Sequence, residues 1–91
     1  MGLKWRVEFH RRAVKDLLLL KQAGLAGKAK AIAEVLERNP FETPPPYEKL
    51  SGDLRGMYSR RINIQHRLVY NVDEENRIVW VLRMWSHYGD N

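Results

Sequence analysis

The chain has 91 residues, a formal net charge of +5, 44% hydrophobic residues and no cysteine. This length and apolar content predict one globular domain over residues 1–91, whose core buries roughly 60% of the unfolded surface. The lack of cysteine excludes disulfides and thiolate metal sites and favours a reducing compartment, so we expect a cytoplasmic protein. The longest apolar run, residues 17–20, is too short to cross a bilayer, and we expect no membrane association.

The first predicted elements are a strand and a helical hairpin. Apolar residues alternate with charged ones from Leu3 to Phe9, which is the period of a half-buried strand. From Arg11 the apolar spacing becomes helical and predicts two helices, with a glycine-containing bend at residues 24–27. The four leucines at 17–20 cannot all face one sheet. A wide core face of the first helix is the commoner explanation for such a run, and the alternative is that one or two of the leucines are exposed or covered by a partner.

The second half of the chain predicts a sheet. All four prolines lie within residues 39–46, which indicates a stiff, extended connector after the second helix. Strands follow at about 57–63, 67–72 and 77–85, and the last is apolar on both faces, as in an interior strand. The order βααβββ predicts an α+β fold, in which the helical hairpin packs on one face of a mostly antiparallel sheet and leaves the other face open.

The basic charge is concentrated in the predicted helices. Residues 1–39 contain nine Lys and Arg residues against four acidic ones, whereas residues 57–91 contain five against four. A basic helical surface favours an anionic partner, although simple solvation of the helices explains the charge equally well.

Arginines in the predicted hairpin are the first candidates for function. A three-residue turn would pair Asn63 with Arg67 and Arg61 with Val69, and it sorts polar from apolar residues better than a two-residue turn. Arg61 and Arg67 then share the open face, while Arg60 falls on the core side and must reach an edge or a helix end. Two guanidinium groups on adjacent strands can grip one phosphate, whereas a lone surface arginine has no such meaning.

A carboxylate and a histidine flank this hairpin. Glu48 follows the proline connector and His87 follows the last strand. Together with the arginines they could cleave RNA: the carboxylate takes the 2′-hydroxyl proton and the histidine protonates the leaving 5′-oxygen, without metal or other cofactor. Taken singly, a loop carboxylate and a terminal histidine are the simpler interpretations. His10 and His66 are predicted turn or strand-end residues without a role, and the histidine spacing does not suggest a metal site.

The run PPPYEKLSGDLRGMYSRRINIQHRLVYNV and the ending VLRMWSHY resemble the Txe/YoeB branch of the RelE/ParE superfamily of toxin–antitoxin toxins. The resemblance covers essentially the whole chain. It implies an endoribonuclease that works on the 70S ribosome, where it would dock on 16S rRNA and cut mRNA in the decoding site to give a 2′,3′-cyclic phosphate and a 5′-hydroxyl. A Phd/YefM-type antitoxin would hold it inactive, and a homodimer is compatible with the branch.

The resemblance also implies roles for single residues. The family's catalytic set falls on Glu48 as general base, Arg61 and Arg67 as phosphate-stabilising arginines, His87 as general acid, and Tyr88 as a residue that positions or stacks on a base. Relatives often carry a lysine where this chain has Ser51, and Lys49 beside the base is its candidate substitute. Lys49 and Ser51 are therefore predicted to contact substrate.

Two other functions are compatible with the same sequence. One is a toxin like the ParE branch, which inhibits DNA gyrase and does not cut RNA, because a shared fold does not decide function. The other is a non-catalytic RNA-binding module, which would explain the charge but not the terminal His-Tyr pair. The acid and base around an arginine pair favour the endoribonuclease.

Overall fold

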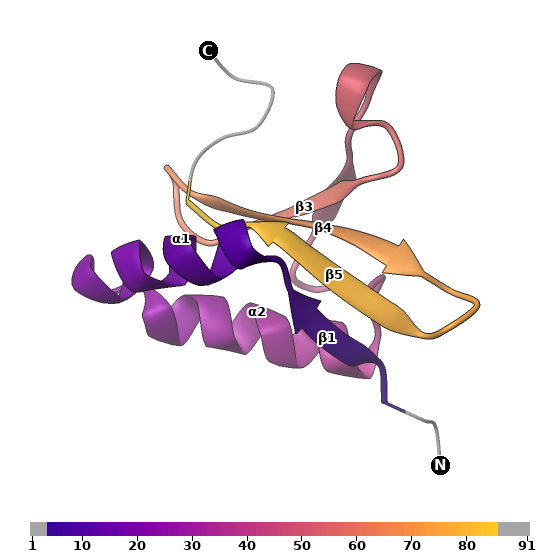
Figure 1. Ribbon diagram of the computed structural model, residues 1–91, viewed down its shortest axis with the longest axis horizontal. Coiled ribbons are helices and arrows are strands. Elements are labelled where there is room, and N and C mark those ends of the chain that lie inside the picture. Colours follow the sequence, from indigo (N-terminus) through magenta and orange to yellow (C-terminus); the bar gives the residue numbers. More distant parts are fainter. Residues whose placement is uncertain (1–3, 86–91) are drawn as a thin grey trace.

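The computed structural model describes residues 4–85, which form two helices on one face of a five-stranded sheet (Figure 1). The elements are β1 (Arg6–Phe9), α1 (Arg11–Gln22), α2 (Ala26–Arg38), β2 (Tyr47–Lys49), the 3₁₀ helix η1 (Gly52–Leu54), β3 (Tyr58–Arg61), β4 (Arg67–Asp73) and β5 (Ile78–Arg83). The predicted α+β class is confirmed. No helix within residues 4–85 is long and apolar enough to cross a membrane.

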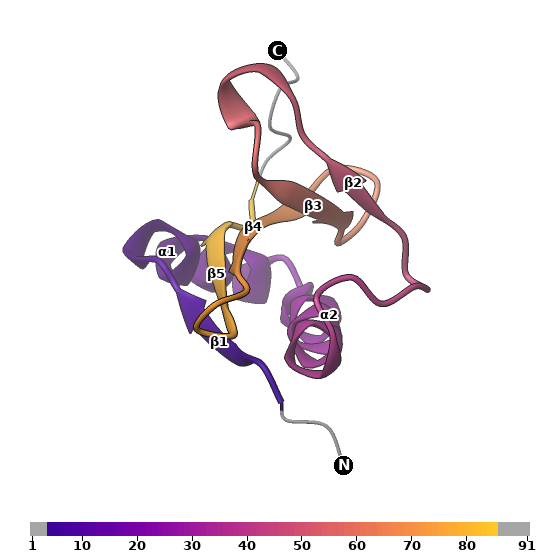
Figure 2. The ribbon, with the colours of Figure 1, turned by 90° about the vertical axis from the view of Figure 1, so that its right-hand side faces the viewer.

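The sheet has the strand order β1-β5-β4-β3-β2 and is mostly antiparallel, as predicted. Among the strands of residues 4–85, only the β1–β5 pair is parallel, and β5 occupies the interior position expected for the last strand. The predicted order βααβββ is wrong in one respect, because it lacks β2 (Figure 2). This strand has three residues and pairs with β3, and a segment so short between prolines and glycine has no alternation from which it could be predicted.

The helices pack through a narrow face and leave part of α1 exposed. Leu20 is fully buried, whereas Leu18 and Leu19 are 59% and 39% exposed. The wide core face is therefore wrong, and the alternative with exposed leucines is confirmed. Gly24 has a φ of 76° between the helices, a conformation that favours glycine, and the bend lies where it was predicted.

The β3–β4 hairpin differs from its predicted register by two residues. Arg61 pairs with Arg67 and Ser59 pairs with Val69, in place of the predicted pairing of Asn63 with Arg67. The side chain of Asn63 accounts for the difference, because its Oδ1 accepts the backbone N–H groups of residues 65 and 66 at 2.8 and 2.7 Å and closes the turn early. Since the shift is even, Arg61 and Arg67 still share the open face, as predicted.

Arg60 lies under the sheet with no exposed surface, on the core side as predicted. Its guanidinium group donates to the carbonyl oxygens of Pro45 at 2.5 Å and Pro40 at 2.8 Å, and to the hydroxyl of Tyr70 at 3.2 Å. The Tyr70 hydroxyl in turn donates to the Pro40 carbonyl at 2.8 Å. Burial raises the pKa of Tyr70, and the nearby Arg60 charge opposes this rise. Arg60 therefore ties the proline connector to the sheet just beyond the end of α2.

Aromatic rings enclose this arginine. Tyr58 stacks on Tyr70 with ring centroids 5.6 Å apart, and Tyr47 of β2 meets Tyr58 edge-on at 5.8 Å. The Arg60 guanidinium carbon lies 5.2 Å from the centroid of the Tyr47 ring, within the range of a cation–π interaction. Tyr47 thus fixes one side of β2 against the core, which directs its neighbour Glu48 to the opposite face.

We expect Arg60→Met to lower the free energy of unfolding by about 3 kcal/mol, because the carbonyls of Pro40 and Pro45 and the hydroxyl of Tyr70 each lose a donor. Tyr70→Phe removes one hydroxyl and should lower it by about 1 kcal/mol. Urea denaturation measures both effects, and Arg11→Met, at an exposed position of α1, is the matched control, expected to stay within about 0.5 kcal/mol of the parent. Equal stability of the two arginine variants would show that the Arg60 network does not stabilise the fold.

Candidate active site

The centre of the candidate site is an ion pair between Glu48 of β2 and Arg67 of β4, which reaches across the strand between them, β3. Arg67 Nη1 donates to Glu48 Oε1 at 2.6 Å and to Ser59 Oγ at 3.2 Å. The pairing of Glu48 with Ser59 puts both side chains on the open face, opposite the helices. The Glu48 side chain is 62% exposed and that of Arg67 is 16% exposed, so the carboxylate reaches solvent while the guanidinium group is held in the sheet.

Arg61 completes a cationic pocket beside this ion pair. Its direct partner across the hairpin is Arg67, and two like charges opposite each other are unfavourable unless an anion lies near them. Glu48 balances one of the two charges, and Arg61 has no ion-pair partner among residues 4–85. The pocket has a volume of about 500 Å³ and is lined by Pro46, Glu48, Arg61, Ile62, Asn63, Ile64 and Arg67. It can accept a phosphate group through Arg61.

The structure brings three of the predicted site residues together and leaves two apart. Glu48, Arg61 and Arg67 line one pocket, and Glu48 lies on β2, the strand that was not predicted. Lys49 and Ser51 are exposed and do not line it, and strand alternation directs Lys49 away from the face of Glu48. Their predicted contact with substrate stays a prediction.

The predicted acid His87 and its neighbour Tyr88 lie outside the described residues. The last described residue is Trp85.

A stacked pair of rings holds Trp85. The rings of His66 and Trp85 are 4.1 Å apart between centroids and inclined by 21°. His66 is 5% exposed, and its Nδ1 has no hydrogen-bond partner within residues 4–85. This histidine was predicted to have no role. Its ring packs against Trp85 and so holds Trp85 beside the turn that precedes Arg67. Sequence offered no signal for the stack, because 19 positions separate the two rings.

A buried carboxylate fixes the same end of β5. Asp16 of α1 is 4% exposed and accepts from Arg83 Nε at 2.8 Å and from the Met84 backbone N–H at 2.9 Å. The interaction joins α1 to the residues that precede Trp85. It was not predicted, because an acidic residue within a helical pattern is most often solvated. Within residues 4–85, no three His, Asp or Glu side chains converge as a metal site would require.

Comparisons with known proteins identify the family of this chain. A family model described as the YoeB-like toxin of a bacterial type II toxin–antitoxin system matches residues 9–88. The chain belongs to the YoeB toxin family. Toxin YoeB of Synechocystis sp. is 38% identical over 73 residues, covering 80% of this chain and 76% of that protein. The resemblance to the YoeB branch is confirmed.

Solved structures of YoeB proteins have the same fold. A chain of the YoeB–YefM complex from Staphylococcus aureus is 32% identical, with a TM-score of 0.76 and coverage of 97% of this chain and 100% of that chain. The YoeB dimer from the same species is also 32% identical, with a TM-score of 0.77 and coverage of 92% and 98%.

We expect His66→Phe to raise the free energy of unfolding by about 1 kcal/mol, because a phenyl ring keeps the stack on Trp85 and removes the buried nitrogen that has no partner. His66→Ala should lower it by about 2 kcal/mol or more, since the stack and its packing are lost. Both values come from urea denaturation monitored by tryptophan fluorescence. Destabilisation by both substitutions to a similar degree would contradict this account of His66.

Proposed function

We propose that this YoeB-family toxin is a ribosome-dependent endoribonuclease that cleaves mRNA in the decoding site and so inhibits translation. The observation that carries the proposal is the convergence of Glu48, Arg61 and Arg67 in one pocket on the helix-free face. An exposed carboxylate beside two guanidinium groups is the combination that a 2′-hydroxyl and its neighbouring phosphate require.

The proposed reaction is an internal transesterification. Glu48 removes the 2′-hydroxyl proton, and the 2′-oxygen attacks the adjacent phosphorus. Arg61 and Arg67 stabilise the negative charge that develops on the phosphoryl oxygens. His87 donates a proton to the 5′-oxygen as its bond to phosphorus breaks, which leaves a 2′,3′-cyclic phosphate and a 5′-hydroxyl. No residue needs a metal or cofactor for these steps.

Two features suit a ribosomal substrate. Nine Lys and Arg residues within 1–39 supply a positive surface for rRNA, and binding of this kind weakens steeply as salt rises. The arginines and the carboxylate lie on the open face of the sheet, so RNA can approach them without displacing the helices.

We expect Glu48→Gln, Arg67→Ala and His87→Ala each to slow cleavage by roughly 10²–10⁴-fold. The three substitutions remove, in that order, the general base, a phosphate ligand and the general acid. The measurement is single-turnover cleavage of mRNA on programmed ribosomes, with the cut position mapped by primer extension. Glu74→Gln, an exposed carboxylate in the β4–β5 turn, is the matched control for Glu48→Gln and should cut at the parent rate. Parent rates for all three site variants would refute the proposal. Intact mRNA together with inhibited DNA supercoiling would favour the gyrase-directed alternative.

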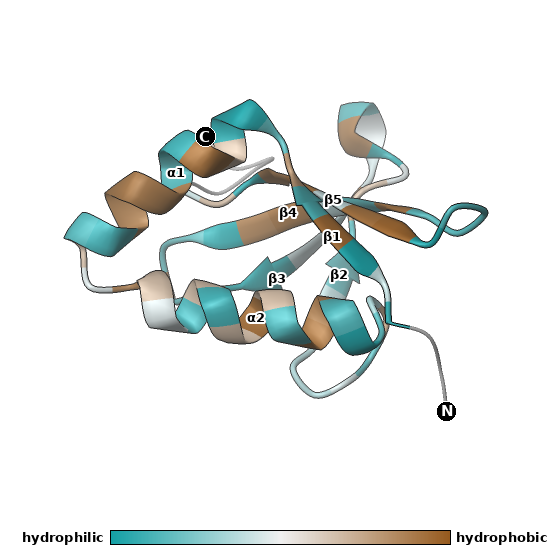
Figure 3. Cartoon of the chain, turned by 60° about the horizontal axis from the view of Figure 1, so that its bottom comes forward, coloured by the Kyte–Doolittle hydropathy of each residue, from teal (hydrophilic) through white to brown (hydrophobic). Residues whose placement is uncertain are grey.

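We further infer that a YefM-type antitoxin binds this toxin, as the existence of a YoeB–YefM complex in S. aureus supports, and that it covers exposed apolar surface. Helix α1 contains hydrophobic stretches between its hydrophilic ends (Figure 3). Three of its hydrophobic residues, Val14, Leu18 and Leu19, are each more than a third exposed and are referred to as the α1 strip. Such a strip is suited to an amphipathic, acidic segment that folds on binding, because lysines flank it. The same strip is available to a second copy of this chain. The S. aureus YoeB dimer supports a homodimer as the second proposed assembly.

Leu18→Glu should weaken binding of the co-encoded antitoxin roughly tenfold or more, because a charge replaces a central apolar contact. Free toxin carrying this substitution should cut mRNA at the parent rate. Titration calorimetry gives the affinity, and Gln22→Glu at the exposed end of α1 is the charge-matched control. Equal affinities for the two variants would place the antitoxin on another surface.

A further inference from the structure

A cavity of about 380 Å³ lies on the helix side of the sheet, between the two helices and the end of β1. We propose that this cavity is a binding site for a small amphipathic carboxylate, a medium-length hydrocarbon chain that ends in a negatively charged group. The inference does not rest on the proposed function, and none of the residues that line this cavity belongs to the candidate active site.

The inner surface of the cavity is apolar and fixed in place. Met84 lines it with no exposed surface, and the buried carboxylate of Asp16 accepts the Met84 backbone N–H at 2.9 Å. Phe9, at the end of β1, and Leu17 of α1 also line the cavity, and Phe9 is 38% exposed. A ligand would therefore meet a preformed apolar surface, which is the usual form of a small-molecule site.

A row of three alanines keeps the cavity open. Ala26, Ala29 and Ala33 follow one another at helical spacing along α2, and all three line the cavity. The larger apolar residues of this helix, Ile32 and Leu36, are buried in the core and do not fill it. Apolar space that side chains leave unfilled costs stability in proportion to its volume, and it accepts apolar ligands in preference to water.

Two ammonium groups stand at the entrance of the cavity. Lys21 at the end of α1 and Lys30 of α2 are exposed lining residues, and neither has an ion-pair partner among residues 4–85. The other lining residues are all apolar. An apolar interior with cations at its entrance matches a molecule whose chain is buried while its anionic head stays in water beside the lysines.

The neighbouring surface favours a short ligand over an acidic peptide. A smaller cavity shares Phe9, Lys30 and Ala33 with this one. It continues along α2 to Glu34 and Glu37, whose carboxylates would repel an acidic segment that ran along the helix. At roughly 30 Å³ for each group of the size of a water molecule or a methylene, the proposed site holds a chain of about ten carbons.

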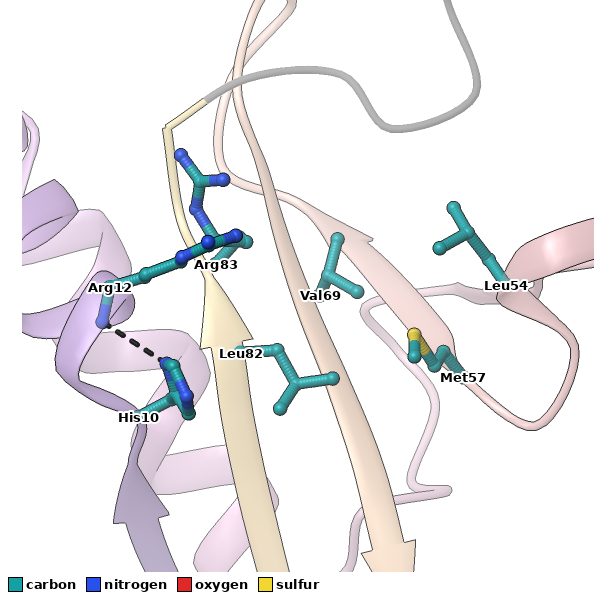
Figure 4. Close-up of a pocket in the computed structure, with 7 residues that line it drawn as sticks. All are labelled: His10, Arg12, Leu54, Met57, Val69, Leu82 and Arg83. Atoms are coloured by element: carbon teal, nitrogen blue, oxygen red, sulfur yellow. Dashed lines mark hydrogen bonds between the residues drawn. The ribbon is translucent and has the colours of Figure 1, made fainter.

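Decanoate, titrated below the concentration at which it forms micelles, is the probe. Methyl NMR shifts of Leu17 and Met84 should move and saturate. Since each buried methylene strengthens binding about fourfold, octanoate should bind roughly tenfold more weakly than decanoate. A pocket on the open face, lined by Arg12, Leu54 and Leu82 among others (Figure 4), serves as the control for unspecific attraction to positive charge, and its methyl shifts should stay unchanged.

Ala33→Leu should lower the affinity for decanoate roughly tenfold or more, because the added carbons occupy the place of ligand methylenes. Ala31→Leu, at an exposed position of α2 outside the cavity, is the matched control and should bind like the parent. Thermal unfolding will show that the variants are folded, and Ala26→Leu gives the same test if Ala33→Leu is not. Lys30→Gln should weaken decanoate binding about threefold and leave decanol binding unchanged, whereas Lys28→Gln, outside the cavity, should change neither.

Unmoved methyl shifts of the cavity, shifts of equal size in both pockets, or equal affinities of Ala31→Leu and Ala33→Leu would overturn the proposal. Shifts that follow the protein concentration and not decanoate would overturn it in favour of a second copy of this chain. Tighter binding of an acidic antitoxin peptide than of decanoate, lost in Ala33→Leu, would overturn it in favour of a protein partner. These measurements use no RNA, so the outcome for Glu48→Gln on ribosomes is separate from them.

Discussion

The site depends on a charge that is buried beneath it. Arg60 has no exposed surface, and a guanidinium group so placed is costly unless its donors are satisfied. The carbonyls of Pro40 and Pro45 satisfy it because the proline-rich connector forms neither helix nor ladder there, so its acceptors are available. The same contacts bring the connector under the sheet and set β2 beside β3. The position of the candidate base Glu48 thus follows from an interaction on the opposite face.

Strand alternation lets one hairpin perform two tasks. In β3, Tyr58 and Arg60 face the helices, while Ser59 and Arg61 face the open side. Two adjacent arginines in the motif SRRI therefore have opposite environments: one is enclosed by aromatic rings and carbonyls, and the other meets solvent. Because its side chains alternate between the two faces, the four-residue strand β3 contributes both to the core and to the candidate active site.

The spacing of apolar residues along the sequence was sufficient to predict the helices, most of the strands and the faces that they bury. The fold class, the interior position of β5 and the shared face of Arg61 and Arg67 follow from alternation and helical spacing, and the structure bears them out. The hairpin register depends on the amide of Asn63, and β2 is too short to have a pattern. The stack of His66 on Trp85 joins residues far apart in sequence, and no local rule predicts such a contact. The resemblance identified the family, which charge and spacing did not.

The odd loop between the two arginines restricts how this hairpin can change in length. Five residues separate Arg61 from Arg67, and the parity of that number decides whether both side chains emerge on one face. Deleting or inserting one residue would turn one arginine into the core, whereas a change of two residues would preserve the pair. Loops usually tolerate length variation freely. In this hairpin, the number of residues between the two arginines should change among natural variants only by two at a time. The sequence of the turn should therefore vary more than its length.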